Sequence, residues 1–172
     1  MRALTIFMTF LLCVAVTLVV ICVFALLSSV GGFLIGATDY ITGFTELELS
    51  HMVDVRNIFV WVFILTPIIL VASIVFLVKQ KDWKGMLWGS AIFIDLVLII
   101  GLAFLINFDW AFELFHDVFF PQGNWQFSVD SAIITTFPLS YFVTVVIVTT
   151  AISISFATML LILSIRRVIK KA

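Results

Sequence analysis

Two histidines are the first candidates for chemistry in this sequence, because imidazole gains and loses a proton near neutral pH. His51 lies in the segment Ser50-His51-Met52-Val53-Asp54-Val55-Arg56-Asn57, immediately before an apolar run. His116 follows another apolar run, within the unusually aromatic segment 108–142. If the fold brings both rings to one face of a membrane, they provide a general base and a general acid. We therefore predict one shared site that contains both histidines.

The aromatic segment predicts an amphipathic helix at a membrane surface, where aromatic rings are enriched. In helical spacing, the apolar face consists of Phe112, Phe115 and Phe119. The polar face consists of Asp109, Glu113, His116 and Asp117. Pro121 and Gly123-Asn124 end the helix, and Trp125 returns to the boundary. The simpler alternative is an aromatic belt that only anchors the protein, but an anchor does not require the polar face.

The composition predicts an integral membrane protein with an all-α fold. Of the 172 residues, 64% are hydrophobic and 11% are charged, whereas soluble domains carry about 25% charged residues. The net charge of −1 indicates no nucleic-acid partner. We predict a single four-helix membrane domain over residues 1–172, with spans at residues 3–36, 58–78, 86–108 and 137–165. Outer loops 37–57 and 109–136, including the interfacial helix, cap it, and Gly31-Gly32 is the expected bend in the long first span.

The basic residues predict how the domain is oriented. Eight of the nine lie at one face: Arg2, Lys79, Lys81, Lys84, Arg166, Arg167, Lys170 and Lys171. Only Arg56 lies at the other face, beside the histidines. Because loops rich in Lys and Arg stay in the cytoplasm, both termini are predicted to be cytoplasmic and the histidine site extracytoplasmic.

The polar neighbours of His51 allow several interpretations. Ser50 is the expected N-cap of a helix that carries His51 and Asp54 one turn apart. Asp54 orients His51, pairs with Arg56, or is simply solvated while Arg56 extends to lipid phosphate. We predict that Arg56 and Asn124 position the polar part of a substrate, with Asn124 donating to a developing oxyanion.

Three other notable residues fall inside the predicted spans. Cys13 and Cys22 are interpreted as small buried apolar residues, not as a disulfide or metal pair. Asp95, in the third span, is either a functional carboxylate or a polar contact of Ser153 or Ser155 in the fourth span. Its role stays open on the sequence alone.

The sequence resembles the bacterial lipoprotein intramolecular transacylase (Lit) family in these motifs: His51-x-x-Asp54-Val55-Arg56, Phe115-His116-x-x-Phe119-Phe120, Gly123-Asn124-Trp125-x-Phe127, Asp130 and Phe137-Pro138. The resemblance extends over essentially the whole chain in size and number of spans. It implies an enzyme that moves the sn-2 acyl chain of a diacylglyceryl-cysteine to the α-amino group of the same N-terminal cysteine, giving a lyso-form lipoprotein. It also implies that His51 and His116 are the functional histidines. The implied partners are a diacylated lipoprotein and membrane lipid, in a bacterial cytoplasmic membrane.

An ester-to-amide transfer suits the residues present. The amine itself attacks, so the reaction needs only a base for the amine and an acid for the departing alkoxide. The predicted catalytic residues are His51 as base and His116 as acid or oxyanion partner. The predicted substrate-binding or supporting residues are Asp54, Arg56, Asp117, Asn124, Trp125 and Asp130. No metal or cofactor is expected, because no ligand set has diagnostic spacing.

Three other classes of protein remain open on the sequence alone. A metal-dependent membrane hydrolase would use both histidines with some of Asp54, Asp117 and Asp130 as ligands. A small transporter would use Asp95 inside the membrane. A non-catalytic assembly or sensor protein would use neither. The sequence does not determine the oligomeric state.

Overall fold

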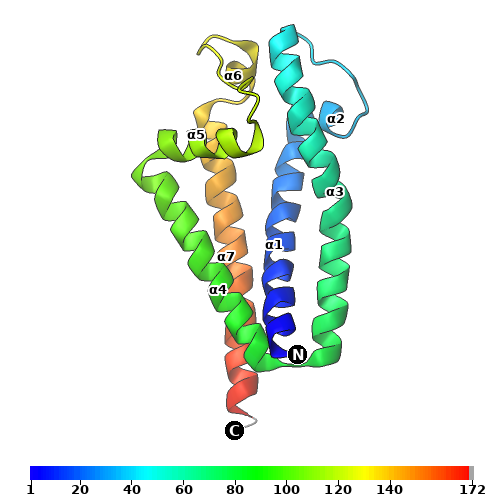
Figure 1. Ribbon diagram of the computed structural model, residues 1–172, viewed down its shortest axis with the longest axis vertical. Helices are drawn as coiled ribbons and strands as arrows, with labels where there is room; N and C mark the ends of the chain where they lie inside the picture. Colours follow the sequence, from blue (N-terminus) through cyan, green and yellow to red (C-terminus); the bar gives the residue numbers. More distant parts are fainter. Residues whose placement is uncertain (171–172) are drawn as a thin grey trace. The chain divides into compact units, whose positions relative to one another are not determined.

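The computed structural model describes residues 1–170, which form seven helices and no strand (Figure 1). Four of the helices are long and apolar enough to cross a membrane: α1 (Arg2–Leu27), α3 (Glu46–Gln80), α4 (Trp83–Ile106) and α7 (Leu139–Ile169). Three shorter helices lie between them: α2 (Gly31–Leu34), α5 (Phe108–Phe119) and α6 (Ala132–Thr136). The predicted all-α fold with four membrane-spanning helices is confirmed.

The first apolar run is not one continuous helix. α1 ends at Leu27, where the Ser28 hydroxyl donates to the Ala25 carbonyl at 2.6 Å. The chain then turns into α2, and a Cβ atom at Gly31 would collide with the Leu26 carbonyl. The predicted span 3–36 therefore breaks just before Gly31-Gly32, because a capped carbonyl and a glycine allow the chain to turn there.

α3 begins at Glu46, more than one turn earlier than expected, because Thr45 and Glu48 form a capping box. The Thr45 N–H and hydroxyl donate to the Glu48 carboxylate at 2.7 and 2.8 Å, and the Glu48 N–H donates to the Thr45 hydroxyl at 3.3 Å. This reciprocal pairing satisfies N–H groups at the helix start. Ser50 was therefore the wrong N-cap: it lies inside α3.

α3 has 35 residues, roughly 52 Å at 1.5 Å per residue. A hydrocarbon core of about 30 Å needs only about 20 of them. The apolar stretch 58–78 supplies this length. The first three turns of α3, which carry Glu48 and His51, therefore lie outside the membrane-spanning part.

The chain divides into two compact units, and the first, here called the terminal unit, comprises residues 1–20, 64–101 and 148 onward. Its helices pack through small and hydroxyl side chains: a Cβ atom at Gly89 would lie 2.6 Å from both the Ile6 carbonyl and Thr9 Cβ. The Thr17 and Ser153 hydroxyls are hydrogen bonded at 2.8 Å. Close backbone approach at glycine is characteristic of helices packed in membranes.

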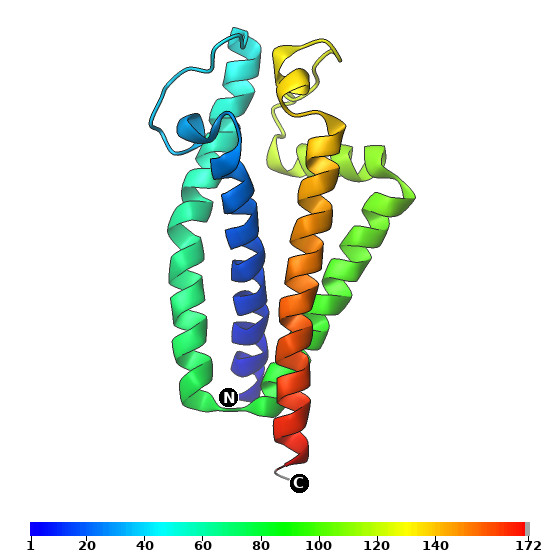
Figure 2. The same cartoon turned by 180° about the vertical axis from the view of Figure 1, so that it is seen from behind.

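One end of the terminal unit gathers the start of α1, the turn between α3 and α4, and the end of α7 (Figure 2). Arg2 approaches Asp82 at 4.0 Å, and the Arg167 guanidinium lies 5.4 Å from the centre of the Trp83 ring. Seven of the nine basic residues belong to this unit, and Lys171 lies outside the described residues. Only Arg56 belongs to the second unit.

Asp95 is exposed on α4. Within residues 1–170 it takes part in no hydrogen bond or ion pair. A contact with Ser153 or Ser155 was one of two interpretations of Asp95, and neither contact is present among residues 1–170. The Ser153 hydroxyl bonds to Thr17 on α1.

The second unit, here called the histidine unit, comprises residues 21–63 and 102–147. Asn107 separates α4 from α5, and its side chain caps α5 by accepting from the Trp110 N–H at 3.1 Å. A single residue thus connects the end of α4 to the start of α5. The Glu48 carboxylate accepts from the Ile133 N–H at 2.8 Å, which ties α6 to the start of α3. The apolar core of the histidine unit contains Ala25, Val30, Phe33, Leu34, Met52 and Ile133.

α5 buries a different face from the one predicted. Ala111 and His116 are buried, whereas Phe115 and Phe119 are 45% and 49% exposed. The prediction that His116 shares a polar face with Asp109, Glu113 and Asp117 was wrong. The physical reason is that apolar side chains of a membrane protein can face lipid, so apolar spacing does not identify the packed face.

Candidate active site

His51 on α3 and His116 on α5 stack against each other, with ring centres 6.2 Å apart and planes 26° apart. Both side chains are buried, with exposed fractions of 6% and 8%. The predicted approach of the two rings is thus present in the structure. Two imidazoles at this spacing can reach different atoms of one small reacting group.

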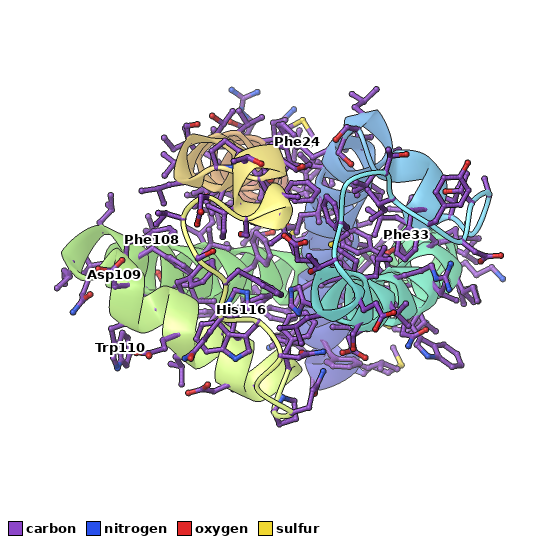
Figure 3. The ribbon with its side chains drawn as sticks, turned by 90° about the horizontal axis from the view of Figure 1, so that it is seen from above. Phe24, Phe33, Phe108, Asp109, Trp110 and His116 are labelled. Carbon is purple, nitrogen blue, oxygen red and sulfur yellow. The ribbon has the colours of Figure 1, made fainter. Side chains whose placement is uncertain are left out.

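Aromatic rings enclose the histidine pair. His51 lies 4.7 Å from the Phe120 ring and 5.7 Å from the Phe127 ring. His116 lies 4.0 Å from Phe112 and 4.8 Å from Trp125. Figure 3 shows His116 surrounded by side chains, with Asp109 and Trp110 toward the other end of α5. The enclosure replaces water with apolar surface, which disfavours a charged imidazole.

His116 is held in one tautomer by the main chain. Its Nδ1 lies 2.8 Å from the Phe112 carbonyl oxygen. A carbonyl only accepts, so Nδ1 carries the hydrogen and Nε2 holds the free lone pair. Burial lowers the pKa of His116 below 6.5, although the bond to Phe112 and the charge of Asp117 act to raise it.

His51 has a similar electrostatic balance. Burial is the main cause that lowers its pKa below 6.5, and the charge of His116 lowers it further. Asn124 and Asp54 act to raise it. Burial is the main cause at both histidines, because one aromatic enclosure desolvates both rings, and the pKa of each is lowered. Each ring is therefore neutral, and a base, near pH 7.

Asp54 binds two amides from the loop after α5. Its carboxylate accepts from Gln122 Nε2 at 2.7 Å and from Asn124 Nδ2 at 2.8 Å. The same Asn124 nitrogen lies 3.4 Å from the Ser50 hydroxyl. Gln122 was missed by the sequence analysis, although it lies in the same turn as Asn124 and has the same amide chemistry.

Arg56 does not pair with Asp54. Its guanidinium donates to Asp39 at 3.2 Å and lies 4.6 Å from the centre of the Phe33 ring. The carboxylate of Asp39 is 93% exposed. Arg56, on α3, thus pairs with the loop that precedes α3 rather than with Asp54.

The other predicted supporting residues are placed unequally. Trp125 packs on His116. Asp117 and Asp130 are exposed, and a hydrogen bond with Ser128 lowers the pKa of the Asp130 carboxyl. Within the part of the chain that the structure describes, no three His, Cys, Asp or Glu side chains are grouped so that they could hold a metal ion.

Comparison with known proteins gives matches of three kinds. The family described as lipoprotein intramolecular transacylase Lit matches residues 38–142, a segment that contains every predicted site residue. An uncharacterized protein of Aquifex aeolicus (strain VF5) is 32% identical over 103 residues, which are 57% of this chain and 45% of that protein. This chain thus spans less than half the length of that relative.

The third match is to solved structures. The membrane integral lipoprotein intramolecular transacylase Lit from Bacillus cereus is 20% identical, with a TM-score of 0.67 over 99% of this chain and 98% of that one. A variant of that protein with a histidine replaced by arginine has the same identity and TM-score, over 99% of this chain and 93% of that one. At this identity the likeness concerns the fold, which four membrane helices already define here.

Proposed function

Because the chain belongs to the lipoprotein intramolecular transacylase (Lit) family, we propose that it is an acyltransferase that modifies bacterial lipoproteins in the membrane. The acyl chain at sn-2 of the diacylglyceryl-cysteine moves to the α-amino group of the same N-terminal cysteine. The product is a lyso-form lipoprotein. The observation that carries this proposal is the buried, stacked pair of histidines inside the segment that matches the family.

The transfer has a simple proton balance. The neutral amine attacks the ester carbonyl and forms the C–N bond, the C–O bond to the glycerol breaks, and the released oxygen becomes a hydroxyl. Nitrogen therefore loses one proton and oxygen gains one, so the protein ends in its starting state. The α-amino group has an ordinary pKa of about 7.7–8.0, and a neutral imidazole can accept the proton that must leave.

The two rings divide this work in the proposal. His51 takes the proton from the attacking amine. Because neutral His116 has no hydrogen on Nε2, this proton passes to His116 Nε2, which then donates it to the leaving oxygen. The bond from His116 Nδ1 to the Phe112 carbonyl leaves its Nε2 directed away from the main chain for this purpose. The charge of His116 acts to lower the pKa of His51, which disfavours two protons on the pair. A single proton therefore passes between the substrate atoms and the pair.

The surroundings of the pair support a lipid substrate. α5 exposes Phe115, Val118 and Phe119, an apolar surface suited to the boundary of a bilayer. An ester at the glycerol would lie at this depth, with its acyl chains in the membrane. Holding amine and ester on one molecule also supplies much of the entropic advantage of the reaction.

We place the site at the extracytoplasmic face of the bacterial cytoplasmic membrane, with both ends of the chain in the cytoplasm. The support is the distribution of Lys and Arg between the two units. A Gly123→Cys variant should react with an impermeant thiol reagent added outside the cell, whereas Lys81→Cys should not. The opposite pattern would overturn this orientation.

The proposed reaction is tested on the N-terminal lipopeptide of a lipoprotein made with and without this protein. An intramolecular transfer leaves the mass unchanged, so fragmentation must locate the acyl chains. We expect one amide-linked chain on the cysteine nitrogen and one ester-linked chain on the glycerol. Two ester-linked chains would contradict the proposal. A heavier lipopeptide with three chains would instead indicate transfer from a separate donor lipid.

A further inference from the structure

Two polar atoms at the centre of the site have no hydrogen-bond partner of good geometry. They are His51 Nδ1 and Asn124 Oδ1, and both are buried. Buried polar atoms in proteins are almost always hydrogen bonded. One of these atoms is able to donate and the other only accepts, so the two are chemically complementary.

The orientation of the Asn124 amide is determined by Asp54. A carboxylate only accepts, and Asp54 lies 2.8 Å from the Asn124 side chain. The amide nitrogen must therefore face Asp54, which turns Oδ1 away from it. Gln122 donates to the same carboxylate oxygen at 2.7 Å and so helps to hold it in place.

We propose that Asn124 is a positioning residue for His51: its Oδ1 accepts the Nδ1 hydrogen of His51, and Asp54 holds the amide in that orientation. His51 is then kept in the tautomer whose Nε2 is free to take the proton of the attacking amine. This inference rests on the proposed function, but it concerns the state of the ring and can be tested apart from it.

Two further observations support this assignment. The Asn124 side chain lies near enough to His51 to raise the pKa of its imidazole, even though the strict geometry of a hydrogen bond is not met. Catalytic hydrogen bonds are often long in the absence of substrate and shorten when it binds. Moreover, the Asn124 nitrogen is engaged by Asp54 and lies near Ser50. It is therefore poorly placed to donate to an oxyanion, which is the role that the sequence predicted for it.

The two histidines would then present the same nitrogen for different reasons. His116 is fixed by the main-chain carbonyl of Phe112. A side-chain substitution at Phe112 does not remove this carbonyl. His51 is fixed by a side chain that lies 73 positions away in the sequence, and this support can be removed by mutation. The tautomer of His51 alone is therefore open to direct test.

The first test uses nitrogen NMR, because the chain contains only two histidines. In a His116→Ala background purified without a polyhistidine tag, ¹⁵N-labelled histidine reports His51 alone. We expect mainly the Nδ1–H tautomer with Asn124 present, and a mixture of tautomers in His116→Ala/Asn124→Ala. A predominant Nε2–H form with Asn124 present, or the same tautomer ratio in both proteins, would overturn the proposal. Neither result depends on acyl transfer, so failure here is distinct from failure of the proposed function.

The second test is the pH dependence of acyl transfer in the otherwise unchanged protein. Asn124→Ala should lower the rate by about 10- to 100-fold, less than loss of a general base that contributes roughly 10² to 10⁴-fold. The acid limb of the pH–rate profile of this variant should move to lower pH, because Asn124 acts to raise the pKa of His51. Asn124→Asp should move the limb to higher pH, because a negative charge favours imidazolium.

Gln122→Ala is the matched control, since Gln122 also donates to Asp54 but is exposed and comes from the same turn. A role limited to holding this loop predicts similar losses for Gln122→Ala and Asn124→Ala and no movement of the acid limb. The positioning role predicts a distinctly smaller loss for Gln122→Ala, and limbs that move in opposite directions for the two Asn124 variants. Equal losses, or unmoved limbs, would overturn it.

Discussion

The two units of this protein bury polar groups in different ways. In the terminal unit the buried polar groups are all hydroxyls. Some bond within a helix, as Thr9 does to Thr5, or to one another, as Thr17 does to Ser153. Others have no hydrogen-bond partner among the described residues: Thr66, Ser73, Ser90, Thr149 and Ser164. In the histidine unit they are titratable groups, namely Glu48, His51 and His116, and the bond from the Ile133 N–H to Glu48 joins distant parts of the chain. Small hydroxyl residues permit close packing at little cost, whereas buried titratable groups require a defined environment for each atom. The difference fits a packing role for the terminal unit and the proposed chemistry for the histidine unit.

The comparison predicts its largest effect at the histidines. His51→Ala and His116→Ala should each reduce acyl transfer by about 10² to 10⁴-fold, while the protein still folds in the membrane. The measurement is lipopeptide fragmentation at equal protein level, with size-exclusion chromatography in detergent as the check on folding. If either variant kept full activity, the shared role of the two rings would be disproved.

Glu48 tests whether a buried charge in the histidine unit serves stability. Burial acts to raise its pKa, but hydrogen bonds from Thr45 and Ile133 outweigh this and lower the pKa below 4.5. A carboxyl with a lowered pKa in the folded state contributes stability above its unfolded pKa, and this is lost as pH falls through the folded pKa. Glu48→Gln should thus lower the free energy of unfolding at pH 7 by about 1–3 kcal/mol.

The thermal stability of Glu48→Gln should also fall less steeply between pH 5 and pH 3 than that of the unchanged protein. Glu46→Gln is the matched control, because Glu46 is exposed in the same turn. An equal loss in both variants would show that the charge at the helix start matters, rather than the buried contact.

Gly89 tests the packing role of the terminal unit. A Cβ atom there would lie 2.6 Å from the main chain at Ile6, so Gly89→Ala should separate α4 from α1 and cost about 1–3 kcal/mol. The rate per folded molecule should stay near that of the unchanged protein. Gly101→Ala is the control in the same helix: no atom lies within 4 Å of its added Cβ, and alanine favours a helix by up to about 1 kcal/mol. Equal melting temperatures for the two variants would contradict this account.

The smallest effect is expected at Arg56. Its partner Asp39 is 93% exposed, and exposed ion pairs contribute at most about 1 kcal/mol, equivalent to about fivefold in rate. Arg56→Ala and Asp39→Asn should therefore each change the transfer rate by less than this. A much larger loss in Arg56→Ala alone, measured under the same conditions, would restore a direct role of Arg56 in substrate binding.

Local sequence was enough to predict the all-α fold, the number of membrane spans and the aromatic segment that encloses His116. These features depend on the apolar character of neighbouring residues and on helix geometry, and both can be recognised within a short segment of sequence. The position of both histidines outside the spans follows in the same way, from the polar residues that surround each of them.

Only the tertiary structure decided which atoms meet. Asp54 binds Asn124 across 70 positions, Arg56 takes Asp39 rather than Asp54, and Glu48 bonds to Ile133 across 85 positions. Such partners depend on how loops close, which no local pattern encodes. The packed face of α5 was also decided there, because Phe115 and Phe119 follow the apolar spacing of a packed face and yet are exposed. In a membrane the apolar pattern that marks the inside of a soluble protein loses that meaning, so only tertiary contacts could place His116 on the buried face.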